Sequence, residues 1–423
     1  MIDTAAVDAL ADRVLGPEHK SLPPSAWGRT AREFLATAPG LGAFQTPLLS
    51  LDRAALAHNT AVMGEWANAA GVRLAPHGKT TMAPRLWSDQ LAAGCWAITL
   101  ATGWQVQLAR AFGVRRIVLA NTLLDPVVLR WLADELARDQ DFEFYCWVDD
   151  PAGVDIMDGC LAEASLPVQV NVVVELGAPG GRTGLRSVAA AHRVVEAVRR
   201  SRHLRLAGVG GYEAALAGDR ASASLAAVTH LLTELARLHR ELADSGSYPG
   251  PAIVTAGGSA FQDLVIDQLA GLADETGARG VPTTVVLRSG AYLVHDDGFY
   301  AGISPLAPER APHPLRAAMH GWARVVSSPE PGLALLDGGK RDFPYDLGMP
   351  VLQGIPGATI SAFNDQHAFL RLPADAVGPP IGSVVRLGLS HPCTAFDKWR
   401  LIPVVDDAAV TDPTVVDLVH TFF

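Results

Sequence analysis

The chain has 423 residues, with 34 basic and 44 acidic side chains and a net charge of −10. A chain of this length predicts two domains with large buried cores, and the acidic balance argues against nucleic acid as a partner. Every apolar run is shorter than the ~20 residues that span a bilayer. Asp3 and Asp8 stand where a secretory leader would be basic, so we expect no membrane segment and a cytoplasmic location.

Residues 1–43 are predicted to form an N-terminal extension with two helices, near Val7–Leu15 and Thr30–Ala38. From residue 44 to 310, short β-branched runs alternate with amphipathic stretches of helical length. The runs are Val72–Ala75, Cys95–Leu100, Arg116–Ala120, Glu143–Val148, Val168–Val174, Leu204–Val209, Ala252–Thr255 and Thr283–Leu287. This alternation predicts an α/β fold, a (β/α)8 TIM-like barrel, in which functional groups gather on the loops after the strands.

Residues 311–423 follow a different pattern of short strands broken by Gly and Pro, which predicts a C-terminal β domain. The predicted strands are Gly321–Ser327, Leu333–Leu336, Thr359–Phe363, Ala368–Leu372, Val384–Leu389 and Trp399–Val405.

Lys79 ends the segment that contains the first predicted barrel strand. A lysine at this place can form a Schiff base with a carbonyl cofactor, because a partly desolvated amine is a good nucleophile. The alternative is a surface lysine in a turn. His77, two residues earlier, could orient a cofactor or relay a proton, or make only a structural hydrogen bond.

Glycine loops follow the seventh and eighth predicted strands, at Thr255–Ser259 and Arg288–Tyr292. In a (β/α)8 barrel, backbone N–H groups of these two loops commonly bind phosphate. The alternative is a pair of tight turns. After the fifth strand, Arg182 lies in a Gly-Arg-Thr-Gly turn and is a candidate cation near a phosphate, a phenolate or a substrate carboxylate, or else part of a surface ion pair.

Several of these motifs together resemble one known family. They are Pro76–Thr80, the Gly-Arg-Thr-Gly turn, the two glycine loops and Ser390–Cys393. The chain resembles the D-serine dehydratase and D-threonine aldolase group, which are alanine-racemase-like, fold-type III pyridoxal-phosphate enzymes, from about Thr46 to Trp399. The resemblance implies an alanine-racemase-like fold and a homodimer to which the β domain contributes.

The resemblance also implies roles for individual residues. Lys79 would carry the Schiff base with pyridoxal 5′-phosphate, and Tyr212 would lie in the cofactor pocket with Arg182 as a further candidate. The phosphate site implied by the resemblance consists of Thr255, Gly290 and Ala291, with Gly258 and Ser259 nearby.

His391 and Cys393 lie two residues apart, so they project to the same side of an extended segment, and both are good zinc ligands. The alternative is a buried thiol beside a hydrogen-bonded histidine, but the family resemblance favours a metal. A cysteine ligand favours zinc over another divalent ion. Relatives often carry asparagine where this chain has Asp397, a charge that could tune the site, and His367 resembles a polar element of the family near the metal.

The leading hypothesis is a lyase for D-3-hydroxy amino acids of the D-serine or D-threonine dehydratase type, giving a 2-oxo acid and ammonia. The first alternative is retro-aldol cleavage, as in D-threonine aldolase or 3-hydroxy-D-aspartate aldolase. Others are an amino acid racemase, for which Tyr345 is the candidate second acid–base, and a non-catalytic carrier of pyridoxal phosphate. A carrier needs neither the metal pair nor the β domain.

Overall fold

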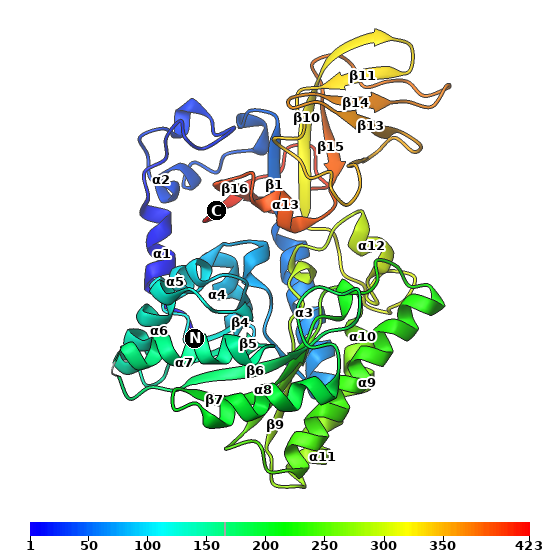
Figure 1. Ribbon diagram of the computed structural model, residues 1–423. Helices are drawn as coiled ribbons and strands as arrows, with labels where there is room; N and C mark the ends of the chain where they lie inside the picture. The colour runs from blue at the N-terminus through cyan, green and yellow to red at the C-terminus, as the bar shows by residue number, and fades with distance from the viewer. Residues whose placement is uncertain (165) are drawn as a thin grey trace. The chain divides into compact units, whose positions relative to one another are not determined.

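The computed structural model describes residues 1–164 and 166–423. The chain forms two compact units, each built around its own sheet (Figure 1). The first, here called the barrel unit, comprises Met1–Asp3, Gly64–Lys79 and Gln90–Gly290. The second, here called the β unit, comprises Thr4–Met63, Thr80–Asp89 and Ala291–Phe423.

The barrel unit contains an 8-stranded parallel sheet in the order β2-β9-β8-β7-β6-β5-β4-β3. The strands are β2 (Arg73–Leu74), β3 (Ile98–Leu100), β4 (Arg116–Thr122), β5 (Glu143–Val148), β6 (Val170–Leu176), β7 (Leu204–Gly211), β8 (Ala252–Ala256) and β9 (Thr283–Leu287). Between the end strands, Trp96 N–H donates to Leu74 O (2.7 Å) and Thr99 N–H to Pro76 O (2.8 Å), which joins the sheet into a barrel. Each predicted barrel run overlaps one of these strands, and the predicted fold class is confirmed.

Helices alternate with these strands along the chain. They are α3 (Arg53–Ala69), α4 (Pro84–Ala92), α5 (Gly103–Ala111), α6 (Pro126–Arg138), α7 (Pro151–Glu163), α8 (Val188–Arg200), α9 (Ser222–Asp244), α10 (Gln262–Leu269) and α11 (Leu272–Gly277). Local capping fixes where they begin: Asp125 accepts from Val127 N–H (2.8 Å) at the start of α6, and Ser187 accepts from Ala190 N–H (3.2 Å) at the start of α8.

The interior of the barrel is a packed cluster of buried side chains that lie in its strands or directly beside them. Its members are Ala75, Ala97, Val118, Tyr145, Trp147, Val173, Ala207, Ile253 and Val286. Because these side chains fill the barrel, the loops at the carboxyl ends of the strands are left as the place for reactive groups.

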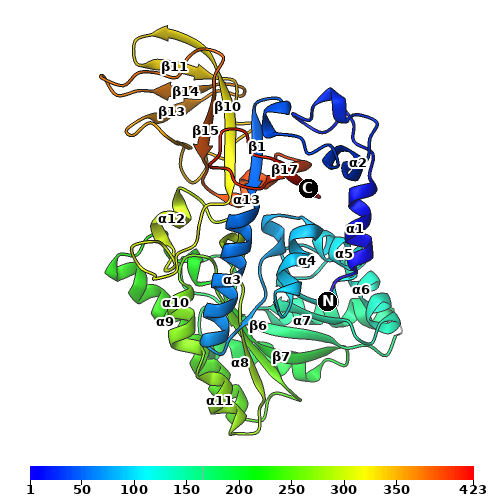
Figure 2. The same ribbon diagram turned by 180° about the vertical axis from the view of Figure 1, so that it is seen from behind.

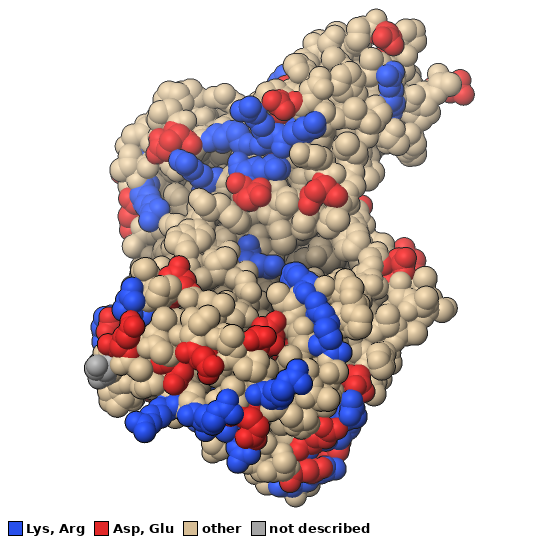
Figure 3. Space-filling model, viewed as in Figure 1, with Lys and Arg blue, Asp and Glu red and all other residues tan. Residues whose placement is uncertain are grey.

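On the face of the barrel unit in Figure 3, basic and acidic side chains are intermingled, and ion pairs such as Arg237–Glu241 (3.0 Å) run along α9.

The β unit contains a 9-stranded sheet in the order β11-β14-β13-β12-β15-β10-β1-β16-β17, seen from behind in Figure 2. The strands are β1 (Leu48–Asp52), β10 (Met319–Glu330), β11 (Leu333–Leu336), β12 (Val351–Leu352), β13 (Thr359–Phe363), β14 (Ala368–Arg371), β15 (Val384–Gly388), β16 (Leu401–Val405) and β17 (Val415–His420). The predicted strands are present, while β1, β12 and β17 were not predicted. The five residues of β1 are all buried, so the strand lacks the polar alternation that marks a half-buried strand.

The first 43 residues contain short helices: α1 (Thr4–Asp8), η1 (Ala9–Asp12), η2 (Pro24–Ala26), α2 (Ala31–Leu35) and η3 (Leu41–Ala43). A capping box between Thr30 and Glu33 starts α2. Lys20 ties the segment to the rest of the β unit, because its Nζ donates to Asp342 Oδ1 (3.1 Å) and lies 3.7 Å from the Trp399 ring centroid. Among the helices of the described residues, none is long and apolar enough to cross a membrane.

Candidate active site

Lys79 lies in the short helix η4 (Gly78–Thr80) directly after β2, at the carboxyl end of the barrel. His77 precedes it and is close to the loop after β9, since a Cβ on Gly290 would lie 2.7 Å from the Cβ of His77. Burial holds the pKa of His77 well below its usual value, and the positive charges of Lys79 and Arg288 lower it further. The imidazole beside Lys79 is therefore neutral at physiological pH.

Arg288 follows β9 and is almost completely buried, with 1% of its surface exposed. Its Nη1 donates to Thr255 Oγ1 (2.6 Å), its Nη2 donates to Gly211 O (2.6 Å), and its guanidinium carbon lies 5.1 Å from the Trp147 ring centroid. Burial lowers the pKa of Arg288 to about 10, so the guanidinium stays charged at neutral pH. A fixed buried cation at this end of the barrel suits an anionic or electron-rich ligand.

Buried polar atoms without a hydrogen-bond partner among the described residues gather at this end of the barrel. His77 Nδ1 follows β2, Glu175 Oε2 lies near the end of β6, and Arg288 Nε follows β9. The carboxyl ends of parallel strands meet at one face of a barrel, so these atoms face the same region of the unit. Because buried polar groups normally have partners, their arrangement indicates a polar ligand.

The glycine loop after β8 is held by a carboxylate. Glu213, in η5 (Glu213–Ala215), is fully buried and accepts from the N–H groups of Gly257 and Gly258, each at 2.9 Å. Burial raises the pKa of Glu213, whereas the hydrogen bond from Gly258 lowers it. Ser289 Oγ in turn donates to Gly258 O (2.6 Å) and links this loop to the one after β9.

This arrangement bears on the residues predicted to bind phosphate. The Gly258 N–H is engaged by Glu213, and the buried Thr255 hydroxyl donates to Val286 O (2.9 Å). Ser259 lies on the same loop, and Gly290 and Ala291 lie together on the loop after β9. The phosphate role stays a prediction for all five residues.

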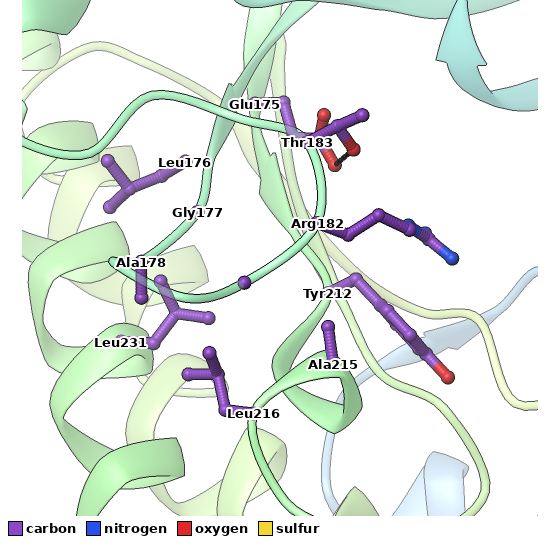
Figure 4. A pocket seen from close by; sticks show the side chains of 11 residues that line it. Glu175, Leu176, Gly177, Ala178, Arg182, Thr183, Tyr212, Ala215, Leu216 and Leu231 are labelled. Carbon is purple, nitrogen blue, oxygen red and sulfur yellow. Dashed lines mark hydrogen bonds between the residues drawn. The ribbon is translucent and has the colours of Figure 1, made fainter.

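Arg182 and Tyr212 come together at the end of the barrel (Figure 4). The guanidinium carbon of Arg182 lies 4.9 Å from the Tyr212 ring centroid. Figure 4 shows both side chains projecting to one side of the loop after β6, and they line a small cavity together with the apolar side chains of Leu216 and Leu231. Thr183 Oγ1 donates to Glu175 Oε1 (3.1 Å), which links this loop to the end of β6.

His391 and Cys393 lie at the start of α13 (Pro392–Phe396) in the β unit. The His391 Nδ1 is 2.5 Å from Asp346 Oδ2, and Cys393 Sγ donates to Thr80 Oγ1 (3.5 Å). Burial of His391 lowers its pKa, but interaction with Cys393 and Asp346 outweighs that effect and raises the pKa to about 8. Imidazole and thiolate are both side-chain groups that suit zinc as ligands.

The described residues contain no group of three or more His, Cys, Asp or Glu side chains placed to hold a metal ion. Any metal at His391 and Cys393 would therefore be held by these two side chains together with other ligands. His367 is exposed between β13 and β14, and its backbone carbonyl accepts from Asn364 N–H (2.9 Å). Asp397 follows α13 and pairs with Lys398 (3.7 Å), and Tyr345 is 42% exposed.

Sequence reasoning missed the carboxylates that hold the site residues. Glu213 binds the glycine loop, Asp346 binds the His391 ring, and Asp296 Oδ2 accepts from the His391 N–H (3.1 Å). None of the three stands in a motif with a sequence signature, and each reaches its partner across a long stretch of chain. The pair of carboxylates at Asp296 and Asp297 was the one local signal, because adjacent acids are costly to bury without partners.

Comparison with known proteins adds an independent finding. Residues 318–405 match the family "Putative serine dehydratase domain". The chain is 28% identical to a D-threonine aldolase of Arthrobacter sp over 372 residues, which cover 88% of this chain and 92% of the relative. Among solved structures, D-threonine aldolase from Filomicrobium marinum has a TM-score of 0.73 at 24% identity, covering 90% of this chain and 96% of that one.

D-threo-3-hydroxyaspartate dehydratase from Delftia sp. HT23 has a TM-score of 0.71 at 20% identity, covering 89% of this chain and 97% of that one. Two further similar structures are of variants of D-threo-3-hydroxyaspartate dehydratase. In one, a histidine is replaced by alanine. In the other, a cysteine two positions later is replaced by alanine, and that protein is in the metal-free form. An alanine-racemase-like protein from Idiomarina loihiensis has a TM-score of 0.71 at 16% identity over 92% of this chain and 98% of that one, which fits the fold. The chain is thus similar to the D-serine dehydratase and D-threonine aldolase-like family, as its sequence motifs predict, and has the alanine-racemase-like fold.

Proposed function

We propose that this protein is a lyase that acts on D-configured 3-hydroxy amino acids with pyridoxal 5′-phosphate and zinc, and that it releases a 2-oxo acid and ammonia. The observation that carries the proposal is the presence in one chain of two reactive groups. One is Lys79 at the carboxyl end of the barrel, beside buried polar atoms that lack partners among the described residues. The other is the pair formed by the His391 imidazole and the Cys393 thiol, which lie two residues apart in the chain.

The residues at the end of the barrel fit the cofactor. Lys79 Nζ would bond to its aldehyde carbon, and the fixed positive charge of Arg288 would suit its anionic groups. Arg182 and Tyr212 would line the pocket, and the loops that carry Ser259, Gly290 and Ala291 would surround the phosphate. When bound, pyridoxal phosphate supplies an electron sink for negative charge that develops at the substrate Cα.

Proton transfer is the task of Lys79 in this proposal. With the substrate held at the cofactor, the Lys79 amine would take the α-proton of the substrate. The His77 imidazole beside it is neutral, so it adds no positive charge to the site, and its two ring nitrogens could relay a proton. Loss of the β-hydroxyl as water, followed by hydrolysis of the resulting enamine, gives the 2-oxo acid and ammonia.

His391 and Cys393 are the proposed zinc ligands. When bound, zinc supplies a Lewis acid that makes the β-hydroxyl a better leaving group. The pair of histidine and cysteine two residues apart has a parallel in the dehydratase whose cysteine variant is in the metal-free form.

Retro-aldol cleavage to glycine and an aldehyde is the second candidate. It is favoured by the 28% identity to a D-threonine aldolase over 88% of this chain. The two reactions share the lysine, the cofactor and the metal, and differ in whether a proton is taken from Cα or from the β-hydroxyl.

Incubation of the full chain, loaded with pyridoxal phosphate and zinc, with D-threonine separates the two reactions. Mass spectrometry should find 2-oxobutyrate and ammonia, with L-threonine left unchanged. Glycine and acetaldehyde would identify an aldolase and overturn the dehydratase assignment. Formation of neither pair of products would contradict lyase action on this class of substrate.

The lysine assignment has a separate check, because the chain contains just four lysines, Lys20, Lys79, Lys340 and Lys398. Borohydride reduction of the cofactor-loaded protein followed by peptide mapping should place the cofactor mass on Lys79. Lys79→Ala should abolish the visible absorbance of the cofactor, whereas the exposed Lys340→Ala should keep it. A label on another lysine would refute the assignment.

We also propose a homodimer, as the family resemblance implies. Light scattering of the purified full chain measures this directly, and a mass of one chain would contradict it.

A further inference from the structure

We infer that Asp346 is a positioning residue that fixes the imidazole of His391, so that Nε2 is the ring nitrogen presented to the metal. This inference rests on the proposed function, in which His391 and Cys393 are zinc ligands. It concerns residues of the β unit alone and assigns a role to a residue that no sequence motif marks.

The hydrogen bonds around Asp346 define the orientation of the ring. Its Oδ2 lies 2.5 Å from His391 Nδ1, and its Oδ1 accepts from Thr394 Oγ1 (2.7 Å). An ionised carboxylate can only accept, so Nδ1 is the donor in this contact. In the neutral imidazole, the remaining lone pair is then on Nε2, which is the atom available to a metal.

The segment that carries Asp346 is itself tied to the ligand segment. Ser390 Oγ donates to Leu347 O (2.8 Å), one residue after Asp346. The same hydroxyl accepts from Phe299 N–H (3.2 Å), at the start of α12 (Phe299–Ile303). These contacts hold the Asp346 segment against the segment that contains His391, so the carboxylate does not depend on its own side-chain torsions alone for its position.

The backbone of His391 is held as firmly as its ring. Its φ of 46° lies in the left-handed region, which is unfavourable for a residue that carries a Cβ. The compensation comes from Asp296, whose Oδ2 accepts from the His391 N–H (3.1 Å) and whose Oδ1 accepts from Tyr300 N–H (2.8 Å). Backbone strain that the surroundings maintain in this way is typical of functional sites.

Stability does not explain the Asp346–His391 contact. The side chains of Asp346 and His391 are 42% and 20% exposed, and ion pairs near the surface contribute little to folding stability. Carboxylates that orient a metal-binding histidine, in contrast, typically change metal affinity by about 10–100-fold. The two roles therefore predict different outcomes when Asp346 is changed.

The test compares zinc binding by full-length variants stripped of metal with a chelator and then titrated with Zn²⁺ against a chromophoric competitor. Asp346→Asn should weaken zinc binding by about 10–100-fold while the unfolding temperature of the metal-free protein changes little. Thr394→Val, which removes the hydroxyl that holds Asp346 Oδ1, should weaken it by less.

Asp397→Asn is the matched control. Like Asp346→Asn, it removes one negative charge from the surroundings of His391. Asp397, however, pairs with Lys398 and has no hydrogen bond to His391 among those found in the described residues. If the zinc affinity of Asp397→Asn stays within about threefold of wild type while that of Asp346→Asn falls much further, the result supports a positioning role for Asp346. Equal weakening of zinc binding in the two variants would show that only the negative charge matters, and it would overturn the positioning role of Asp346.

Co²⁺ binding gives a second readout that does not depend on activity. The near-ultraviolet band of a cobalt-bound thiolate reports Cys393, and the visible bands report the geometry around the ion. Asp346→Asn should keep the thiolate band at saturating Co²⁺ and alter the visible bands, and an unchanged visible spectrum would contradict the inference. Absence of Zn²⁺ and Co²⁺ binding by the wild-type chain would instead overturn the proposed metal site itself, and this role with it.

Discussion

Glu213 shows how one buried side chain can hold a functional loop. Its carboxylate is fully buried and accepts from two successive amides, Gly257 and Gly258. Glycine is required at 257 because its φ of 109° is in the left-handed region and a Cβ there would lie 2.4 Å from Leu287 Cδ1. A loop with such a backbone needs an acceptor for its amides, and Glu213 is that acceptor.

Glu213→Ala should therefore destabilise the protein strongly. It leaves two buried N–H groups unpaired, at a cost of about 1–3 kcal/mol for each. Urea unfolding followed by circular dichroism measures the loss. The control is Glu196→Ala on α8, because Glu196 is exposed and pairs with Arg199 (3.1 Å), a kind of contact worth about 0–1 kcal/mol. Similar losses in both variants would contradict the importance of the two amide bonds.

The loop between β6 and α8 is organised by an arginine near its carboxyl end. Arg186 Nη1 donates to the carbonyls of Thr183 (3.0 Å) and Gly184 (2.9 Å), and its Nη2 donates to Arg182 O (2.6 Å). At the other side of the loop, Gly184 N–H donates to Asp149 Oδ2 (2.9 Å). The position of the Arg182 side chain over Tyr212 thus depends on contacts to the backbone of its own loop.

Arg186→Ala should loosen this loop without unfolding the barrel. Loss of a net ~1.4 kcal/mol of hydrogen bonding corresponds to about tenfold faster amide exchange in residues 181–185, with α8 unchanged. Hydrogen-exchange mass spectrometry measures both regions. Arg193→Ala, an exposed arginine on α8, is the control and should leave the loop as in wild type. Unchanged amide exchange in Arg186→Ala would show that the loop does not need the hydrogen bonds from the Arg186 guanidinium.

The molecule as a whole buries several histidines in the neutral form. Burial lowers the pKa of His239, His295, His320 and His420 to about 4 in each case. His239 illustrates how they are accommodated. Its ring nitrogens form hydrogen bonds with neutral hydroxyl groups, Nδ1 with Tyr248 Oη (2.9 Å) and Nε2 with Thr283 Oγ1 (3.0 Å). Protonation would leave a positive charge in these apolar surroundings.

Stability should accordingly fall as the solution becomes acidic. In the unfolded chain these rings take up protons near pH 6.5, whereas in the folded chain they do so near pH 4. Their contribution is fully present above pH 6.5 and is lost as the pH falls towards 4, by at most ~1.4 kcal/mol per pH unit for each ring. Urea unfolding between pH 4 and 7 measures the slope.

His239→Gln should make this slope shallower, because one ring no longer titrates differently in the two states. The control is His230→Gln on the same helix, α9, where the side chain is exposed. Equal slopes for wild type and His239→Gln would contradict the burial argument.

The order of residues along the chain was enough to predict the barrel, the C-terminal β domain and the similarity to this family. Strand and helix periodicity repeats within short windows, so the eight barrel strands could be placed from local pattern alone. Lys79 at the end of a strand and the His391–Cys393 spacing are likewise local features, and their proposed chemistry follows from residue type and position.

Long-range pairing could not be predicted in this way. β1 precedes the barrel strands in the chain, yet Leu48 pairs with Trp322 of β10 in the sheet of the β unit. Asp346 lies 45 residues before His391, and Glu213 lies 44 residues before Gly257. Such contacts form because folding brings distant segments together and buried polar groups must then find partners, a condition that the local sequence pattern does not contain.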